Sequence, residues 1–176
     1  MIHRRVLFVS AIVAIALSVP FFGRNWNIFM HQLGAVLFLG NIVVSALWMS
    51  LARRADNPEV FRLGVRGIML TDAAFTTPGA LLLLVNGGIL APPYFQAGHA
   101  LWLFVGIGLF ALTGILWTAV LLPAQRGMWR LLNAMPAGGP IPAGADALYQ
   151  RWFRCGGIAS LLPLIAFALM VLKPTN

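Results

Sequence analysis

Residues 101–122 read LWLFVGIGLFALTGILWTAVLL, a run of 22 positions without a charged side chain. The hydrocarbon core of a bilayer is ~30 Å thick and a helix rises ~1.5 Å per residue, so about 20 apolar residues span a membrane. Four further apolar runs of similar length occur along the chain. The sequence therefore predicts an all-α, polytopic integral membrane helix bundle that forms a single domain over residues 1–176. Its five predicted spans are 5–22, 27–51, 66–90, 97–122 and 155–172.

The composition of the chain agrees with a membrane protein and excludes a soluble one. Of 176 residues, 60% are hydrophobic and only 9% are charged, and the mean hydropathy is +0.88. A soluble domain carries about 25% charged residues, so this chain cannot cover itself with a water-compatible surface. The net charge of +8 is therefore interpreted as arginine that faces anionic lipid. The lipid bilayer is the expected partner, and nucleic acid is not expected.

Arginine is distributed unevenly between the two sides of the predicted bundle. Five alternating spans put the N-terminus and the loops 52–65 and 123–154 on one side. Because cytoplasmic loops carry an excess of arginine and lysine, we expect the N-terminus inside, the C-terminus outside and a location in the bacterial inner membrane. The inner side would hold Arg4, Arg5, Arg53, Arg54, Arg62, Arg66, Arg126, Arg130, Arg151 and Arg154, and the outer side Arg24 and Lys173.

Two segments outside the central spans carry further signals. The HRR sequence at 3–5 precedes an apolar stretch, as in a signal peptide, but ALSVP at 16–20 is only a fair cleavage site, which favours an uncleaved anchor helix. In the inner loop, AMPAGGPIPAGAD at 134–146 is Pro/Gly-rich and typical of a linker. The preceding GMWRLLNAM at 127–135 predicts a short interfacial helix.

Three of the predicted spans carry polar, small and aromatic residues at three- and four-residue spacing, which places each set on one helix face. A polar side chain inside a span costs free energy unless it has a partner there, and small residues are typical of membrane helix interfaces. We therefore interpret the glycines as packing residues. The three sets are His31, Gly34, Phe38, Asn41, Ser45 and Trp48; Asp72, Thr76, Gly79, Leu83 and Asn86; and His99, Trp102, Gly106, Thr113 and Trp117.

His31 and His99 both fall near the start of spans that enter from the predicted outer side, so they are expected at the same depth. Two such imidazoles can hold the iron of haem b as axial ligands. Copper is an alternative, because Met30 adds a thioether next to His31, and a third interpretation is a helix-end histidine without a cofactor. The expected haem surroundings are Gly34 and Gly106 beside the ring, Phe38 and Trp102 packed on it, and Arg24 at the propionates.

Asp72 is the acidic residue inside a predicted span, about two turns from the inner surface. Pro78 follows it, frees the carbonyl of residue 74 and kinks the helix. The candidate partners of Asp72 are Thr76, Arg66 or an arginine from an inner loop. A buried acid near a kink can relay protons or gate a path, or it can hold helices in register. Both interpretations stay open.

The order of three segments resembles a known group of sequences. FMHQLGAVLFLGN at 29–41 is followed by TTPGALLLLVNGGIL at 76–90 and LWTAVLLPAQRGMWRLL at 116–132. This order resembles a bacterial family of uncharacterised, predicted integral membrane proteins. More distantly, it resembles the HemJ-type protoporphyrinogen oxidases and the CopD-type copper-resistance domains. The HemJ resemblance implies haem b at His31. The HemJ pattern also has a lysine in a later helix, whereas this chain has only Lys173 near its C-terminus, so haem binding is implied more than the oxidase reaction.

Three classes of function remain. The first is a membrane haem protein for electron transfer (a membrane oxidoreductase if it is an enzyme), with a redox partner or quinone. The second is a non-catalytic membrane subunit or assembly factor. The third is a small transporter or channel-like homo-oligomer that uses Asp72, Asn41 and Asn86. Hydrolytic chemistry is disfavoured, because the sequence has four acidic residues and no metalloprotease or phosphate-loop motif.

Overall fold

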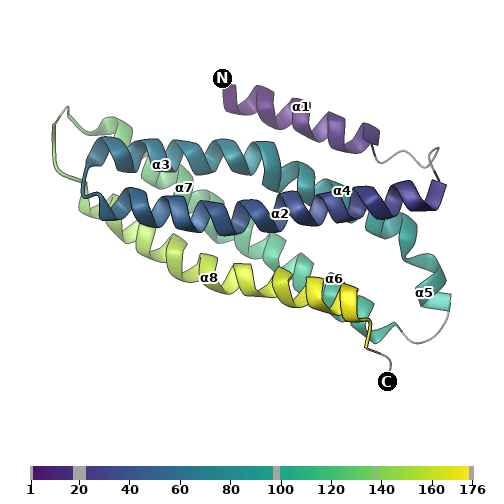
Figure 1. The fold of residues 1–176 in the computed structure, drawn as a ribbon. Coiled ribbons are helices and arrows are strands. Elements are labelled where there is room, and N and C mark those ends of the chain that lie inside the picture. Colours follow the sequence, from purple (N-terminus) through teal and green to yellow (C-terminus); the bar gives the residue numbers. More distant parts are fainter. Residues whose placement is uncertain (1, 18–22, 97–99, 137, 175–176) are drawn as a thin grey trace.

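Helices make up all the regular secondary structure in the part of the chain that the structure, a computed structural model, describes (Figure 1). This part comprises residues 2–17, 23–96, 100–136 and 138–174. It confirms the all-α prediction. The helices are α1 (Ile2–Leu17), α2 (Gly23–Arg54), α3 (Pro58–Thr71), α4 (Thr77–Leu90), α5 (Pro92–Gln96), α6 (Leu101–Leu116), α7 (Leu122–Ala134) and α8 (Ala143–Leu172). Two π-helical turns, η2 (Asp72–Thr76) and η3 (Trp117–Leu121), join α3 to α4 and α6 to α7.

Four continuous helical stretches within the described residues are long and apolar enough to cross a membrane. With 30 to 34 residues each, they extend about 45–50 Å, well beyond the ~30 Å hydrocarbon core. The prediction of five spans is not confirmed, because α1 has only 16 residues and is shorter than the other four. The four stretches are Gly23–Arg54, Pro58–Leu90, Leu101–Ala134 and Ala143–Leu172.

The inner loops expected at 52–65 and 123–154 are mostly helical, which corrects the predicted span boundaries. The first connection consists of residues 55–57 only. Asn57 caps α3 there, because its Oδ1 accepts hydrogen bonds from the backbone N–H of Glu59 at 2.9 Å and of Val60 at 3.2 Å. Pro58 occupies the first turn of α3, where the missing N–H costs nothing. The predicted loops therefore contribute helices to the bundle.

The two π-helical turns stand at the same spacing before a proline. The turn that begins at Asp72 precedes Pro78, and the turn that begins at Trp117 precedes Pro123, six positions on in both cases. In each turn the residue before the proline, Thr77 or Leu122, donates its N–H to the carbonyl five residues back. The wider turn accommodates the proline, which has no N–H and would clash with the carbonyl four residues back. Both helices therefore continue past their proline.

Helix α1 lies alongside the α3–α4 stretch (Figure 1). The Ser10 hydroxyl donates a hydrogen bond to the Ala73 carbonyl at 2.7 Å. In the π-helical register, the partner of this carbonyl would be the N–H of residue 78, which is proline. The Ala73 carbonyl therefore takes its donor from α1. The freed carbonyl of residue 74 stays a prediction. Ala14, one turn further on, is buried against α2 and α4.

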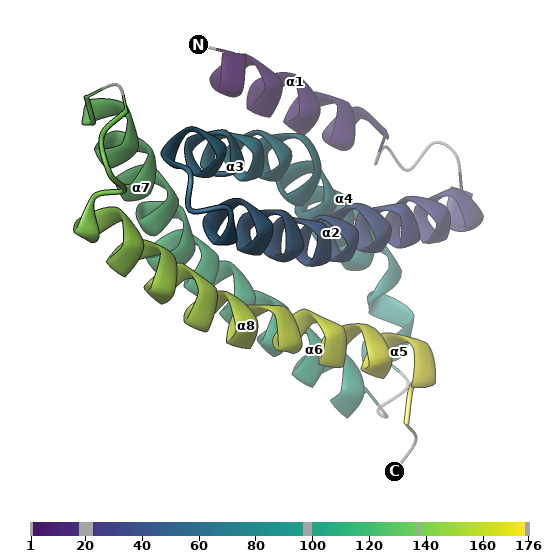
Figure 2. The same ribbon diagram turned by 60° about the vertical axis from the view of Figure 1, so that its left-hand side comes forward.

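Close glycine contacts bring α2 against α4 and α6 against α8 (Figure 2). A Cβ atom added to Gly34 would lie 2.9 Å from the Gly79 carbonyl oxygen, and one added to Gly79 would lie 2.9 Å from the Phe38 nitrogen. A Cβ added to Gly106 would lie 2.6 Å from the Met170 Cε. The interpretation of these glycines as packing residues is confirmed. The space beside Gly34 and Gly106 is filled by neighbouring helices.

A buried apolar cluster joins α2, α3, α7 and α8 at the end of the bundle that holds the 55–57 and 135–142 connections. Met49, Phe61, Val65, Met128 and Leu132 form its fully buried centre. Half of this core therefore comes from α3 and α7, whose residues the sequence placed largely in loops.

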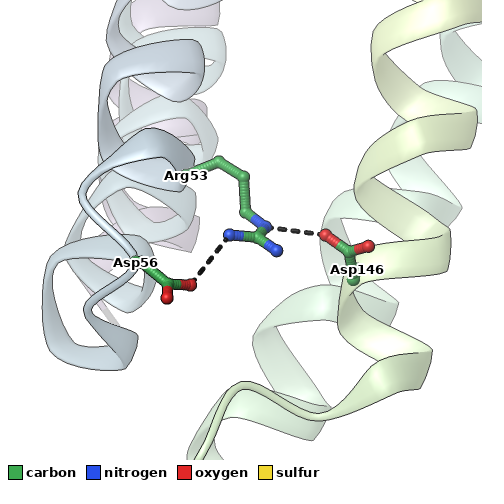
Figure 3. A network of polar contacts seen from close by, with 3 residues as sticks. All are labelled: Arg53, Asp56 and Asp146. Atoms are coloured by element: carbon green, nitrogen blue, oxygen red, sulfur yellow. Dashed lines mark hydrogen bonds and ion pairs between the residues drawn. The ribbon is translucent and has the colours of Figure 1, made fainter.

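A polar bridge on Arg53 closes the same end of the bundle. Arg53 Nε donates to Asp146 Oδ1 at 2.6 Å, and Arg53 Nη1 donates to Asp56 Oδ1 at 3.3 Å (Figure 3). The guanidinium therefore joins the end of α2 to the first turn of α8, instead of facing lipid from a loop. The inside position of this end of the bundle stays a prediction from the arginine distribution.

Candidate functional site around Asp72

Asp72 is buried between the long helices, with 8% of its surface exposed. The helical stretch that carries it begins at Pro58 and ends at Leu90, so Asp72 lies near the middle of the stretch, further from the helix end than the sequence predicted. A carboxylate in this position loses its hydration and must be compensated by partners inside the bundle.

Four side-chain donors surround the two carboxylate oxygens of Asp72. Oδ1 accepts from Asn41 Nδ2 at 3.0 Å and from Thr76 Oγ1 at 2.9 Å. Oδ2 accepts from Gln125 Nε2 at 2.8 Å and, over a longer distance, from Trp117 Nε1 at 3.4 Å. All four donors are neutral, and in the described part of the chain no ion pair involves Asp72. The carboxyl is therefore held by hydrogen bonds from α2, η2, η3 and α7 without a cation.

Further hydroxyl and amide groups extend this network along α2 and the α3–α4 stretch. Asn41 Nδ2 also donates to Thr76 Oγ1 at 2.7 Å, and Ser45 Oγ donates to Asn41 Oδ1 at 3.4 Å. Thr77 Oγ1 donates to the Asp72 backbone carbonyl at 3.0 Å. Asn41 and Thr76, which both touch the carboxyl, are therefore also linked to each other, and Ser45 orients Asn41.

Gln125 has an unused hydrogen-bonding atom. Its side chain is 2% exposed, and its Oε1 atom has no hydrogen-bond partner. Buried acceptors without a partner are uncommon and costly. A half-turn of the amide would bring Oε1 to the Asp72 carboxyl, in place of the Nε2 donor. Gln125 is therefore able to serve Asp72 either as a donor or as an acceptor.

The sequence predicted part of this site. It placed Asp72, Thr76 and Asn41 on buried helix faces, and the structure brings these three together. Arg66, a candidate partner of Asp72, has an exposed side chain. Gln125 was missed, because Pro123 was interpreted as the end of a span and residues 123–154 as a loop.

Asn86 lies apart from the Asp72 network. It is fully buried, and its Nδ2 donates to the Leu82 carbonyl of its own helix at 2.9 Å. Its place on the same predicted helix face as Asp72 therefore does not make it a partner of the carboxyl.

His31 faces α4. Its Nδ1 lies 3.1 Å from the Leu83 carbonyl oxygen, and a carbonyl only accepts, so Nδ1 carries the hydrogen and Nε2 is an acceptor. The ring also packs on Gly87, because a Cβ atom added there would lie 3.0 Å from His31 Cε1. A backbone group therefore orients the imidazole, as the helix-end interpretation expected. The same orientation leaves Nε2 able to bind a metal.

The apolar residues predicted around a haem or copper ion pack against different neighbours. The Phe38 ring packs on Phe110, with ring centroids 5.4 Å apart. Trp102 packs on Tyr94 at 5.3 Å in a separate cluster. Met30, the predicted copper thioether, is buried in an apolar cluster with Ala14 and Leu82. Phe38, Trp102 and Met30 therefore take part in three separate packing contacts.

The predicted second axial ligand, His99, lies outside the described residues. Within the described residues, no group of three or more His, Cys, Asp or Glu side chains is placed to hold a metal ion. The pairing of His99 with His31 stays a prediction.

Comparison with known proteins agrees with the membrane architecture. Residues 28–174 match a family model described as "Predicted integral membrane protein (DUF2269)". No curated protein and no solved structure matches the chain. The matched region extends from the first turns of α2 past the end of α8, so it includes all four long helices and the Asp72 network. The resemblance to an uncharacterised membrane protein family is confirmed, and the chain belongs to the DUF2269 family of predicted integral membrane proteins.

Proposed function

We propose that this chain is a proton-linked inner-membrane protein, a small transporter or channel-like oligomer, in which the Asp72 carboxyl takes up and releases the proton. The observation that carries the proposal is a buried carboxyl surrounded by four neutral donors. An ionisable group in this position is expensive for a membrane bundle and usually serves proton or ion movement. A purely structural role needs no ionisable group, because an asparagine or glutamine also holds helices together.

The partners of Asp72 suit both protonation states. The ionised carboxylate accepts from Asn41, Thr76, Gln125 and Trp117. A protonated carboxyl needs one acceptor for its O–H, and the unpartnered Oε1 of Gln125 supplies it after a half-turn of the amide. The Asp72 carboxyl itself therefore finds a hydrogen-bond partner in either protonation state.

The position of Asp72 couples its protonation to two long helices. Asp72 is the first residue of η2, and Trp117, which donates to it, is the first residue of η3. π-Helical turns are rare interruptions of an α-helix and frequently occur at functional sites. A proton on Asp72 changes the hydrogen bonds of both turns together, which gives the bundle a means to link proton binding to helix movement.

The direct test is infrared difference spectroscopy of the purified protein between acidic and alkaline pH. Wild-type protein is expected to show a buried carboxyl C=O band that Asp72→Asn removes and that Asp146→Asn, at the bundle end, retains. Identical difference spectra of wild type and Asp72→Asn would overturn the proposal. If Asp72→Asn does not fold, Gln125→Leu keeps the carboxyl and is expected to shift the frequency of its C=O band, since it removes a direct hydrogen-bond partner of Asp72.

A flux measurement tests the transport part of the proposal. Liposomes that contain the protein and a pH-sensitive dye are given an inside-negative potential, and proton entry is followed by fluorescence. Entry is expected with wild type and Asp146→Asn, and it should fall to the rate of empty liposomes with Asp72→Asn. Equal rates for wild type and empty liposomes would exclude a channel-like proton path.

A second candidate function, haem or copper binding, is supported by the His31 ring. Its Nδ1 is engaged with the Leu83 carbonyl, which is how histidines that ligate a metal through Nε2 are commonly oriented. Protein expressed with haem supplied would then show a Soret band that His31→Ala abolishes. A colourless protein under these conditions, without bound copper, would exclude this candidate.

A further inference from the structure

Among the residues that the structure describes, two cations and no aspartate or glutamate lie at the bundle end where α2 begins and α8 ends. Arg24 stands in the first turn of α2, and Lys173 follows the last residue of α8. Three of the four acidic residues of the chain, Asp56, Glu59 and Asp146, lie at the opposite end, and the fourth is Asp72. The charge at this end of the bundle is therefore suited to an anionic ligand.

Arg24 and Lys173 both act on Tyr94 of α5. Lys173 Nζ donates to the Tyr94 hydroxyl at 3.0 Å and lies 5.0 Å from the centre of the Tyr94 ring and 5.9 Å from that of Trp102. The hydrogen bond from Lys173 lowers the pKa of Tyr94, and the positive charge of Arg24 acts in the same direction. The aromatic rings thus hold Lys173 by cation–π contacts, and both cations act on the same phenol.

A pocket of about 300 Å³ opens next to Arg24. One of its walls is Asn27, whose side chain is 3% exposed and whose Oδ1 atom has no hydrogen-bond partner. The pocket therefore combines a cation, an unused buried acceptor and an apolar lining. The lining residues are Gly23, Arg24, Asn27, Ile89, Leu90 and Pro93.

We propose that this pocket binds the headgroup of an anionic glycerophospholipid. The phosphate lies between Arg24 and Lys173, and a headgroup hydroxyl or ammonium group donates to Asn27 Oδ1. Phosphate matches paired cations through charge-assisted hydrogen bonds, and only a ligand with a donor satisfies Asn27.

The surroundings of the pocket favour a lipid over free phosphate. Exposed apolar side chains, among them Phe29, Ile89 and Phe95, stand at this end of the bundle, where acyl chains would cover them. Tyr94 and Trp102 are residues of the type that lies at headgroup level. A free phosphate ion would satisfy the cations but would leave these apolar side chains uncovered.

Native mass spectrometry of the protein in a neutral detergent tests the proposal. Phosphatidylglycerol is expected to bind at about tenfold lower concentration than phosphatidylcholine, because the choline group is repelled by the two cations and has no donor for Asn27 Oδ1. The double variant Arg24→Gln/Lys173→Gln should lose this preference. Arg151→Gln, which removes an exposed charge from the other end of α8, should keep it.

A second variant separates the headgroup donor from the charge. Asn27→Leu keeps both cations and is expected to bind phosphatidylglycerol no more tightly than phosphatidic acid, whereas wild type should prefer phosphatidylglycerol. Equal binding of phosphatidylglycerol and phosphatidylcholine by wild type would overturn the proposal. Displacement of phosphatidylglycerol by equimolar inorganic phosphate would overturn it as well, because the pocket would then be a site for the free ion.

Discussion

Trp117 Nε1 lies 3.4 Å from Asp72 Oδ2, and each of these residues is the first residue of a π-helical turn. The two bulged helices therefore meet at one carboxyl. Without the irregular turns, the prolines six positions on would break the hydrogen-bond ladder of both helices inside the bundle. The π-helical turns that accommodate the two prolines therefore also position Asp72 and Trp117 beside each other.

The two donors to Asp72 Oδ2 should differ in their contribution to stability. Gln125→Leu removes the 2.8 Å bond and is expected to lower the free energy of unfolding in detergent by about 1.5 kcal/mol. Trp117→Phe removes only the 3.4 Å contact and should cost about 0.5 kcal/mol or less. Thermal or denaturant unfolding followed by circular dichroism measures both. A larger loss for Trp117→Phe would contradict the order of strength inferred from the distances.

The close approach of α2 and α4 should make Gly34 intolerant of a side chain. The added Cβ of Gly34→Ala would lie 2.9 Å from a backbone oxygen, so the helices must separate, at a cost of about 1–3 kcal/mol. Gly40→Ala on the same helix is the matched control, because its Cβ would have nothing within 4 Å. Unfolding midpoints of the two variants compare them. Equal midpoints would show that the α2–α4 contact is loose.

Helix periodicity predicted the buried face of α2 correctly as far as Ser45 but not beyond it. Asn41 and Ser45 lie on this face as expected, since polar groups in a membrane bundle turn toward partners. Trp48, predicted on the same face, is 64% exposed, and Met49 is buried in its place. A period of 3.6 residues alternates steps of three and four, and a single sequence does not tell which step comes next.

The irregular parts of the bundle were not visible in the sequence. A proline such as Pro123 indicates the end of a span when only regular α-helix is considered. A π-helical turn before the proline removes the clash, and no residue type marks such a turn in one sequence. Gln125 was therefore placed in a loop, and the donor set of Asp72 stayed incomplete. The partners of Asp72 come from three long helices, so only their packing reveals the site.

The hydrogen bond from Ser10 should hold α1 on the bundle. Ser10→Ala leaves the Ala73 carbonyl, which the π-helical turn and Pro78 deprive of a backbone donor, without its 2.7 Å partner. Leaving a buried acceptor unsatisfied costs about 1–3 kcal/mol. Faster hydrogen exchange in α1, measured by mass spectrometry, is the expected result. Ser50→Ala, whose hydroxyl bonds only to its own helix, should leave exchange in α1 unchanged, and an equal effect of both variants would contradict the role of Ser10.

The bridge from Arg53 to Asp146 should contribute modestly to stability, in a manner sensitive to salt. The two side chains are 26% and 37% exposed, so water screens their attraction, and exposed pairs are typically worth about 0.2–1 kcal/mol. A double-mutant cycle with Arg53→Met and Asp146→Asn should give a coupling free energy at the upper end of that range, because the bond is short and Arg53 also holds Asp56. The coupling should shrink when salt is raised from ~0.1 M to ~1 M, as the Debye length falls from ~10 Å to ~3 Å. A coupling that is independent of salt would contradict an attraction between the charges of Arg53 and Asp146.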